Sequence, residues 1–297
     1  MKAIKAPSQI VAALRGGAPV VLSISGGKDS EAMTVAVIRF MHNHGFKNAL
    51  YFVHADLGRM EWAETPAYVQ NMAETYGIPL HIVNRPDDLL EGIQTRAETL
   101  KGQDKPPFPS AAARYCTAGW KRNVINTWIR HTFPAHMTVV QCIGLRRDES
   151  KGRAKTPDYC ANDLASAPTL GRDVLNWYPI ASWGLADVWN ALGVSLDELE
   201  RIQAAVQAGA TPESLGWEYH PAYAYGNERL SCSMCVLASA GDIANGARRH
   251  PETYRALVQI ELESGFAFQK GKPLYEVAPS LLTDEQKAAL LRPYTLY

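Results

Sequence analysis

The sequence has little of what marks a secreted or membrane protein. Its 297 residues hold only five cysteines: Cys116, Cys142, Cys160, Cys232 and Cys235. Five cysteines in a chain of this length, with no apolar signal-peptide core near the N-terminus, argue against a disulfide framework. No apolar run approaches the roughly 20 residues of a membrane-spanning helix. We therefore expect a cytoplasmic protein with no membrane segment, in which some cysteines serve metal, cluster or redox chemistry.

The sequence also lacks an excess of charge of either sign. Its 30 Lys and Arg residues balance 30 Asp and Glu residues, and the formal net charge is zero. Global charge therefore gives no support for nucleic-acid binding, although a local basic patch stays open. Hydrophobic residues make up 46% and charged residues 20%, which is typical of a globular protein with one large or two small domains.

Short apolar runs alternate with helical patterns in the first half of the chain. The alternation predicts strands at residues 19–24, 49–54, 80–83 and 138–145, and helices at residues 30–44, 62–76 and within 114–132. This order predicts an α/β fold, a doubly wound and mainly parallel sheet that binds ligands beyond the carboxyl ends of its strands.

After this region the pattern changes. Residues 100–110 and 151–172 are rich in proline and charge, which argues against regular helices there. Short helices are predicted at residues 185–192 and 196–208. We place a domain boundary near residue 175, between a nucleotide-binding domain of residues 1–175 and a mostly helical portion of residues 176–297 that carries the Cys pair.

The most informative motif follows the first predicted strand, which contains Ser23 and ends at Ile24. It reads Ser25-Gly26-Gly27-Lys28-Asp29-Ser30 and opens a helix. A strand, a glycine turn and a helix start direct backbone N–H groups at an anion, and adjacent glycines let a phosphate approach closely. Lys28 supplies a mobile cation, Ser30 a hydroxyl, and Asp29 a metal contact or a helix-start charge. The spacing fits neither a Walker A loop nor a dinucleotide fingerprint.

The motif resembles the PP-loop of ATP pyrophosphatases, S-G-G-x-D-S. Three further segments extend the resemblance to the phosphoadenylylsulfate (PAPS) reductase family, which has the adenine-nucleotide α-hydrolase-like fold. They are the strand end His54-Ala55-Asp56, the charged turn at residues 144–150, and the run from His220 to Arg229. The resemblance implies a nucleotide site built from these segments, whose residues are Ser23, Ser25, Gly26, Gly27, Lys28, Asp29, Ser30, His54, Asp56, Gly144, Arg146, Glu149 and Arg229.

The cysteines extend the resemblance to the family's iron–sulfur branch. Cys116 and Lys121 match its first cysteine element, in which Tyr115 replaces another cysteine, and Cys232 and Cys235 match its C-x-x-C. The resemblance implies three ligands, Cys116, Cys232 and Cys235, for a [4Fe–4S] cluster. Since such a cluster normally takes four thiolates, one iron would accept Cys160 or exogenous sulfide.

Other uses of the cysteines stay open. A zinc site with three Cys and one His would take His220 or His250 as its fourth ligand. A metal-free redox dithiol is the other alternative. Cys142 lies in an apolar run and is expected to be a buried small hydrophobe.

Two departures from the family narrow the function that the resemblance implies. The chain has no E-C-G-x-H element, which thioredoxin-dependent reductases carry at their end, and its first cysteine element has one cysteine. What remains is a divergent group, and the chain resembles the sulfur-transfer ATPases of DNA phosphorothioation systems and related reductase-like proteins. The resemblance implies that the protein uses ATP with Mg²⁺ and that Lys28, Asp29, Arg146 and the three cysteines are catalytic. It also implies a cysteine desulfurase as the sulfur donor and a nucleic-acid substrate that is reached through a partner subunit. Alternatives are an assimilatory reductase acting on PAPS or adenylylsulfate, and a nucleotide-binding subunit without turnover.

Overall fold

The computed structural model describes residues 1–291, so the end of the predicted 176–297 portion lies outside the described residues. The chain forms two compact units, each built from separate segments of the sequence. The first unit comprises Met1–Ala55, Glu64–Val83 and Asn123–Ala224. The second comprises Asp56–Ala63, Asn84–Arg122 and the described part of Tyr225–Tyr297.

The first unit is built around one six-stranded sheet. Its strands are β1 (Val20–Ser23), β2 (Leu50–Ala55), β3 (Leu80–Val83), β4 (Val139–Ile143), β5 (Tyr159–Ala161) and β6 (Val174–Trp177). They lie in the order β3-β2-β1-β4-β6-β5, and every pair is parallel except β5 with β6. The order reverses at β1, so the carboxyl ends of β1 and β4 form the switch point where such sheets bind ligands. The predicted doubly wound, mainly parallel α/β fold is confirmed.

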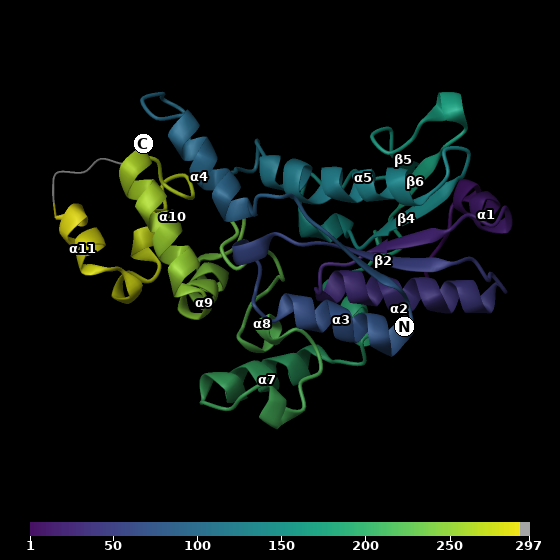
Figure 1. Ribbon diagram of the computed structural model, residues 1–297. Coiled ribbons are helices and arrows are strands. Elements are labelled where there is room, and N and C mark those ends of the chain that lie inside the picture. Colours follow the sequence, from purple (N-terminus) through teal and green to yellow (C-terminus); the bar gives the residue numbers. More distant parts are fainter. Residues whose placement is uncertain (292–297) are drawn as a thin grey trace. The chain divides into compact units, whose positions relative to one another are not determined.

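Helices cover both faces of this sheet (Figure 1). The helices of the first unit are α1 (Ser8–Arg15), α2 (Lys28–Asn43), α3 (Thr65–Tyr76), α5 (Asn123–Thr132), α6 (Leu185–Ala191), α7 (Leu196–Gln207) and α8 (Pro221–Ala224). Helix α5 packs on one face, where Ile129 meets Val21 and Val53 in a buried cluster. Helices α2 and α3 lie on the other face (Figure 1). Burial on both faces explains why the central strands read as continuous apolar runs.

The second unit is helical. It contains α4 (Leu89–Thr99), α9 (Ala240–Arg249), α10 (Pro251–Ser264), α11 (Asp284–Leu290) and a π-helical turn at Thr117–Arg122. Buried Trp120, Tyr254 and Leu257 belong to its core. Short 3-10 segments complete both units: Gly58–Met60, Arg147–Glu149, Pro168–Leu170, Glu213–Leu215, Leu274–Glu276 and Pro279–Leu281. No helix within residues 1–291 is both long and apolar enough to cross a membrane.

The division between the units does not fall at residue 175, where the sequence analysis places a boundary. Strand β6 runs through that position, and the chain stays with the sheet unit as far as Ala224. The reason is physical: β6 pairs in parallel with β4, and helix α6 packs against α2, so the segment after residue 175 completes the sheet and its cover. The mostly helical portion that carries the Cys pair begins at Tyr225 and includes segments from earlier in the chain.

Candidate functional site

The glycine turn after β1 has the geometry of an anion-binding loop. Gly26 adopts a φ of 73°, in the left-handed region that favours glycine, and Gly27 caps the N-terminus of α2 in an extended conformation. Ser30 closes the turn, because its hydroxyl donates to the Gly27 carbonyl at 2.8 Å and accepts from the Ser25 amide at 3.2 Å. The turn therefore presents the amino end of a 16-residue helix at the carboxyl end of β1.

Lys28 is held inside this turn. Its side chain is only 2% exposed, its ammonium lies 3.1 Å from the Asp29 carboxylate, and it sits 5.1 Å from the centre of the Tyr223 ring. The Lys28 backbone amide donates to the Tyr223 hydroxyl at 2.9 Å. The sequence predicts a mobile cation at this position; in the structure, Tyr223 contacts the Lys28 amide and Asp29 pairs with its ammonium, and its mobility stays a prediction.

Asp29 joins Lys28 to the charged turn after β4. Its carboxylate accepts from the Arg146 guanidinium at 2.5 Å, and Arg146 also donates to Asp148 at 2.6 Å. Burial acts to lower the pKa of Arg146, but the surrounding carboxylates outweigh burial and raise that pKa. The carboxylate of Glu149 accepts from the Arg146 backbone amide at 3.1 Å. Lys28, Asp29 and Arg146 thus form a row of alternating charges at the switch point.

The turn and the end of β4 approach each other closely at Gly144. A Cβ atom on Gly144 would lie 2.7 Å from the Asp29 carbonyl oxygen and 2.9 Å from the Ser30 Cα atom. Only glycine fits there without displacing the loop. Three residues earlier, within β4, the Gln141 side-chain amide donates to the Ser23 hydroxyl at 2.9 Å, which ties β4 to the end of β1. A polar residue inside the apolar run of β4 is the signal by which Gln141 could have been found.

Three other residues predicted to contact the nucleotide are His54, Asp56 and Arg229, and only His54 lies in the first unit. His54 is buried in β2, and its Nδ1 atom lies 3.1 Å from the Ile24 carbonyl oxygen. Asp56 follows β2 directly and accepts from the Gly58 amide at 2.8 Å. Arg229 is exposed in the second unit. The first unit therefore brings together the loop, Gly144, Arg146, Glu149 and His54. The nucleotide-binding roles of these residues, and those of Asp56 and Arg229, remain predictions.

The second unit gathers the three cysteines that the sequence analysis pairs. Cys116, Cys232 and Cys235 are half-buried free thiols, and all three act electrostatically on the ammonium of Lys121. Burial acts to lower the pKa of Lys121, but these thiols and Glu61 outweigh burial and raise it. Burial raises the pKa of Cys232 to about 12, although Lys121 opposes that rise. The thiols share a cationic partner that would offset their charge on deprotonation.

Hydrogen bonds from backbone amides fix the C-x-x-C turn at Ser233 and at Cys235. The Ser233 amide donates to the Met60 carbonyl at 2.9 Å, and the Leu237 amide donates to the Cys235 sulfur at 3.4 Å. A Cβ atom on Gly246, in α9, would lie 1.9 Å from the Ser233 carbonyl oxygen. The sequence analysis did not identify Met60 or Gly246, because each acts through a backbone contact that its side-chain type does not reveal.

The first cysteine element is anchored by its tryptophan. Trp120 lies in the π-helical turn between Cys116 and α5, and its indole N–H donates to the Asp87 carbonyl at 3.0 Å. The ring lies against Gly92 of α4, where a Cβ atom would come within 2.2 Å of it. Such π-helical turns are rare and frequently occur at functional sites. The turn positions Cys116 and Lys121 at the two ends of one short segment.

The three thiols and Lys121 bear on both kinds of metal centre that the sequence leaves open. Three thiols with an ammonium beside them are chemically suited to an iron–sulfur cluster, whose thiolates attach to separate iron atoms. A mononuclear zinc ion needs its ligands to converge at about 2.3 Å from one point. Within residues 1–291, no group of three or more His, Cys, Asp or Glu side chains is arranged to hold a metal ion, so the cluster and the zinc site both stay predictions.

The two histidines considered as zinc ligands are held by other contacts. His220 is fully buried, and its two ring nitrogens lie 3.1 Å from the Thr65 hydroxyl and 3.2 Å from the Ala222 amide nitrogen. Burial lowers the pKa of His220 to about 3, so the ring is neutral. His250 precedes α10 and packs edge-on against Trp62, with ring centroids 5.5 Å apart. Both histidines thus have structural contacts.

The other two cysteines belong to the sheet of the first unit. Cys160 lies in β5, with its sulfur 3.6 Å from the Tyr178 hydroxyl and 4.0 Å from the Asn176 amide nitrogen. Its role as a fourth cluster ligand remains a prediction. Cys142 is fully buried in β4, and burial raises the pKa of its thiol. The prediction that Cys142 packs as a small hydrophobe is confirmed.

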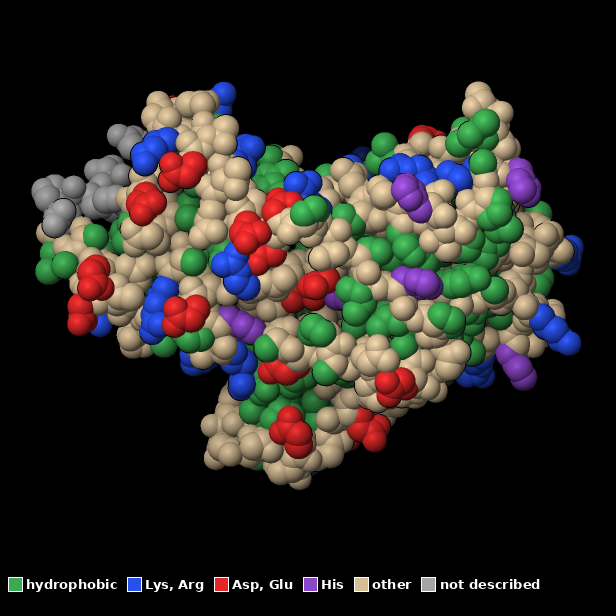
Figure 2. Space-filling view, in the orientation of Figure 1, with side chains coloured by type: hydrophobic (Ala, Val, Ile, Leu, Met, Phe, Trp, Pro, Cys, Tyr) green, Lys and Arg blue, Asp and Glu red, His purple; other side chains and the backbone are tan. Residues whose placement is uncertain are grey.

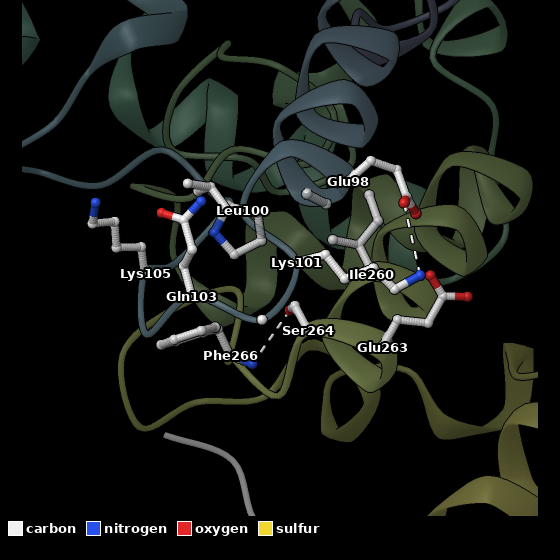
Figure 3. Close-up of a pocket in the computed structure, with 12 residues that line it drawn as sticks. Glu98, Leu100, Lys101, Gln103, Lys105, Ile260, Glu263, Ser264 and Phe266 are labelled. Atoms are coloured by element: carbon white, nitrogen blue, oxygen red, sulfur yellow. Dashed lines mark hydrogen bonds and ion pairs between the residues drawn. The ribbon is translucent and has the colours of Figure 1, made fainter.

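The second unit also has a small cavity away from the cysteines. Between the end of α4 and the end of α10 lies a cavity of about 70 Å³, drawn in Figure 3, which is too small for a nucleotide. The Glu98 carboxylate lies 3.7 Å from the Lys101 ammonium at its rim, and none of the predicted nucleotide, catalytic or metal residues lines it. On the face drawn in Figure 2, Lys and Arg side chains are interspersed with Asp and Glu side chains.

Comparison with solved structures gives distant likenesses. A U34-tRNA thiolase, NcsA from Methanococcus maripaludis with its [4Fe–4S] cluster, is 14% identical over 86% of this chain and 74% of its own, with a TM-score of 0.43. An FMN adenylyltransferase from Candida glabrata, in complex with FAD and inorganic pyrophosphate, is 15% identical over 61% of this chain, with a TM-score of 0.34. The alignment spans 49% of that adenylyltransferase chain. Likenesses at this level carry no argument about activity.

Comparison with protein families is more informative. None of the curated proteins matches the chain. The phosphoadenosine phosphosulfate reductase domain matches residues 19–195, which is more than half of the 297 residues. The matched region begins just before β1 and includes the glycine turn, Gly144 and Arg146. The chain therefore belongs to the phosphoadenosine phosphosulfate reductase domain family.

Proposed function

We propose that the protein is an ATP pyrophosphatase-type enzyme that adenylylates a substrate and then transfers sulfur to it. The observation that carries the proposal is the loop at the switch point, where Gly26 and Gly27 open the amino end of α2 beside Lys28 and Arg146. This arrangement suits the polyphosphate of a nucleotide, because backbone N–H groups and two cations face one edge of the sheet.

The first chemical step would be attack of a substrate oxygen on the α-phosphorus of ATP. The bond between the α-phosphorus and the bridging oxygen breaks, pyrophosphate leaves, and the substrate becomes an adenylate. Loop amides other than those of Ser25 and Lys28, which donate to the Ser30 and Tyr223 hydroxyls, would hold the β- and γ-phosphates. Lys28 and Arg146 would offset the charge that builds on the leaving pyrophosphate. Binding would require Lys28 and Arg146 to exchange part of their pairing with Asp29 for phosphate oxygens.

The same pairing bears on Mg²⁺. The Asp29 carboxylate already bridges Lys28 and Arg146, so a metal ion would compete with two cations for it. We therefore propose that Mg²⁺ binds together with the nucleotide, coordinated mainly by its phosphate oxygens and by water.

In the second step, a sulfur nucleophile would displace AMP from the adenylate and form the new bond to sulfur. Cys116, Cys232 and Cys235 would hold a [4Fe–4S] cluster, which when bound supplies an iron site open to exogenous sulfide. Lys121 would offset the charge of the deprotonated thiols, and the Leu237 amide would orient Cys235. We propose a nucleic-acid backbone phosphate or base as the sulfur acceptor, reached through a partner subunit, with a cysteine desulfurase as the sulfur source.

The family match favours a second candidate, an assimilatory-type reductase of PAPS or adenylylsulfate. The products distinguish the two candidates, because the first releases pyrophosphate and AMP from ATP and the second releases sulfite from PAPS or adenylylsulfate.

The test compares wild type, Lys28→Gln and the control Lys47→Ala, with ATP, PAPS and adenylylsulfate supplied in separate assays, each containing a thiol reductant as the two-electron donor. Glutamine keeps most of the buried stem of Lys28 and removes its charge, whereas Lys47 is exposed. We expect pyrophosphate release from ATP that falls by on the order of 10²–10³ in Lys28→Gln and is unchanged in Lys47→Ala. Equal turnover by Lys28→Gln and wild type, with the circular dichroism spectrum unchanged, would contradict the loop assignment. Sulfite release from PAPS or adenylylsulfate, without turnover of ATP, would establish the reductase instead.

A further inference from the structure

A second cavity lies in the first unit, on the side of α2 that faces α3. It has a volume of about 460 Å³ and is lined by residues of α2, of α3 and of the segment before α8: Glu31, Tyr68, Asn71, Met72, Thr75, Tyr76, Glu218 and Tyr219. This volume is within the range of small-molecule sites. The proposed ATP chemistry makes no use of this cavity.

The lining is acidic and aromatic. It contains two carboxylates and three phenol rings, and none of its described residues is Lys, Arg or His. Burial raises the pKa of Tyr76 and of Tyr219 to about 12, so both phenols are neutral at physiological pH. Neutral phenol rings present negative faces, which attract cations and repel anions. The chemistry of the walls therefore disfavours a nucleotide or another phosphate ligand here.

One of the two carboxylates is built into the wall. Glu31 is only 8% exposed, and its Oε2 atom accepts from the Tyr68 hydroxyl at 2.6 Å. Within residues 1–291, no other hydrogen bond or ion pair reaches the Glu31 carboxylate. A carboxylate buried to this extent normally has a cation or several donors as partners. Glu31 has one neutral hydroxyl, and its second oxygen is left for a ligand in the cavity that it lines.

We propose that this cavity binds a small organic ammonium ion, with the charged nitrogen at the Glu31 carboxylate and its alkyl part among the tyrosine rings and Met72. Glu218 lies on the exposed rim and adds a second negative charge at the entrance. A divalent metal ion suits the site less well, because it would want several convergent oxygen ligands, and the neutral phenols are poor ones. The apolar ring faces also favour a ligand with a hydrocarbon part.

The experiment uses the full-length protein and n-butylammonium as the probe, with 1-butanol as a neutral molecule of the same size. Binding is followed at pH 8 by saturation-transfer NMR and calorimetry. We expect n-butylammonium to bind at roughly millimolar concentrations and 1-butanol to bind at least about tenfold more weakly.

Three variants test the assignment to this cavity. Glu31→Gln keeps the size of the side chain and an oxygen that accepts from Tyr68, and it should weaken n-butylammonium binding by on the order of ten- to hundredfold. Thr75→Lys places an ammonium group in the cavity from an exposed position of α3, and it should abolish binding. Glu213→Gln removes the same charge from an exposed position outside the lining, and it should bind as wild type does.

Several results would overturn the proposal. These are the absence of n-butylammonium binding to the wild type, equal binding of 1-butanol, and wild-type affinity in Thr75→Lys. If Glu31→Gln fails to fold, Thr75→Lys still decides the question, because it leaves Glu31 and its hydrogen bond in place. Turnover of ATP is not needed for any of these measurements, so this proposal and the proposed enzymatic function can fail separately.

Discussion

The substitution Gly144→Ala should show whether the position of the loop matters for turnover. It adds one methyl group between the end of β4 and the start of α2. In Gly144→Ala the new Cβ atom would lie 2.7 Å from the Asp29 carbonyl oxygen and 2.9 Å from the Ser30 Cα atom. Ordinary contacts of a Cβ atom begin near 3.4 Å. Both obstructing atoms belong to the backbone, so no side chain can rotate away. The first turn of α2 must therefore move from β4 by on the order of 0.5 Å.

The expected magnitude follows from this displacement. Overpacking of a well-packed interior costs about 1–3 kcal/mol, so we expect the free energy of unfolding in urea to fall by that amount. The displacement also moves the Gly26-Gly27 turn and Asp29 relative to Arg146. Because a misplacement of about 1 Å in a catalytic site can cost 10²-fold, pyrophosphate release from ATP should fall by on the order of ten- to hundredfold.

Gly152→Ala is the matched control, since its Cβ atom would meet only the Ser150 hydroxyl, at 3.9 Å. It lies eight positions further along the same charged segment (152 − 144 = 8) and should retain the stability and turnover of the wild type. If Gly144→Ala were as stable and as active as Gly152→Ala, the argument that this glycine sets the position of the loop would be refuted. A loss of stability without a loss of turnover would show that the loop adapts and that its position is not critical.

Two further predictions concern the second unit. Gly246→Ala should lower the free energy of unfolding by about 1–3 kcal/mol or more and disturb the C-x-x-C turn, because its Cβ atom would lie 1.9 Å from the Ser233 carbonyl oxygen. Urea unfolding and the reactivity of the thiols test this prediction. Unchanged thiol reactivity would contradict it. Burial raises the pKa of Glu261 from 4.5 to about 7. The folded protein therefore holds the Glu261 proton more tightly than the unfolded chain does, and the free energy of unfolding should fall as pH rises from about 4.5 to about 7. Glu261→Gln should reduce this pH dependence. Urea unfolding curves at a series of pH values test the prediction, and an identical slope in wild type and variant would contradict it.

The parts of the fold that could be predicted from the sequence are those with strong local signals. The predicted strand at residues 80–83 coincides with β3, and Gly77, with a φ of 62°, ends α3 where the sequence predicts a stop. Helix α4 was not predicted, although Asp88 and Glu91 form a capping box at its start, a signal that could have identified it.

Strands β5 and β6 were not predicted, and their local signals are weak. Strand β5 has three residues and lies within a segment rich in proline and charge. It forms at the edge of the sheet because β6 offers it an antiparallel partner, which no local pattern reveals. The missed strands also explain why the units do not divide at residue 175: completing the sheet takes residues from beyond that point.

The sequence by itself determined the kind of chemistry at the candidate site. The order of residues 25–30 after an apolar strand is enough to predict an anion-binding turn, because strand, turn and helix cap depend on neighbours in the chain. Only the tertiary structure decided that Lys28 in that turn is buried and that Asp29 pairs with Arg146. The partner of the Lys28 amide is Tyr223, which lies 195 residues away, and Asp29 meets Arg146 across 117 residues. Burial and pairing of this kind depend on which distant segments the sheet brings together, and a linear pattern does not encode them.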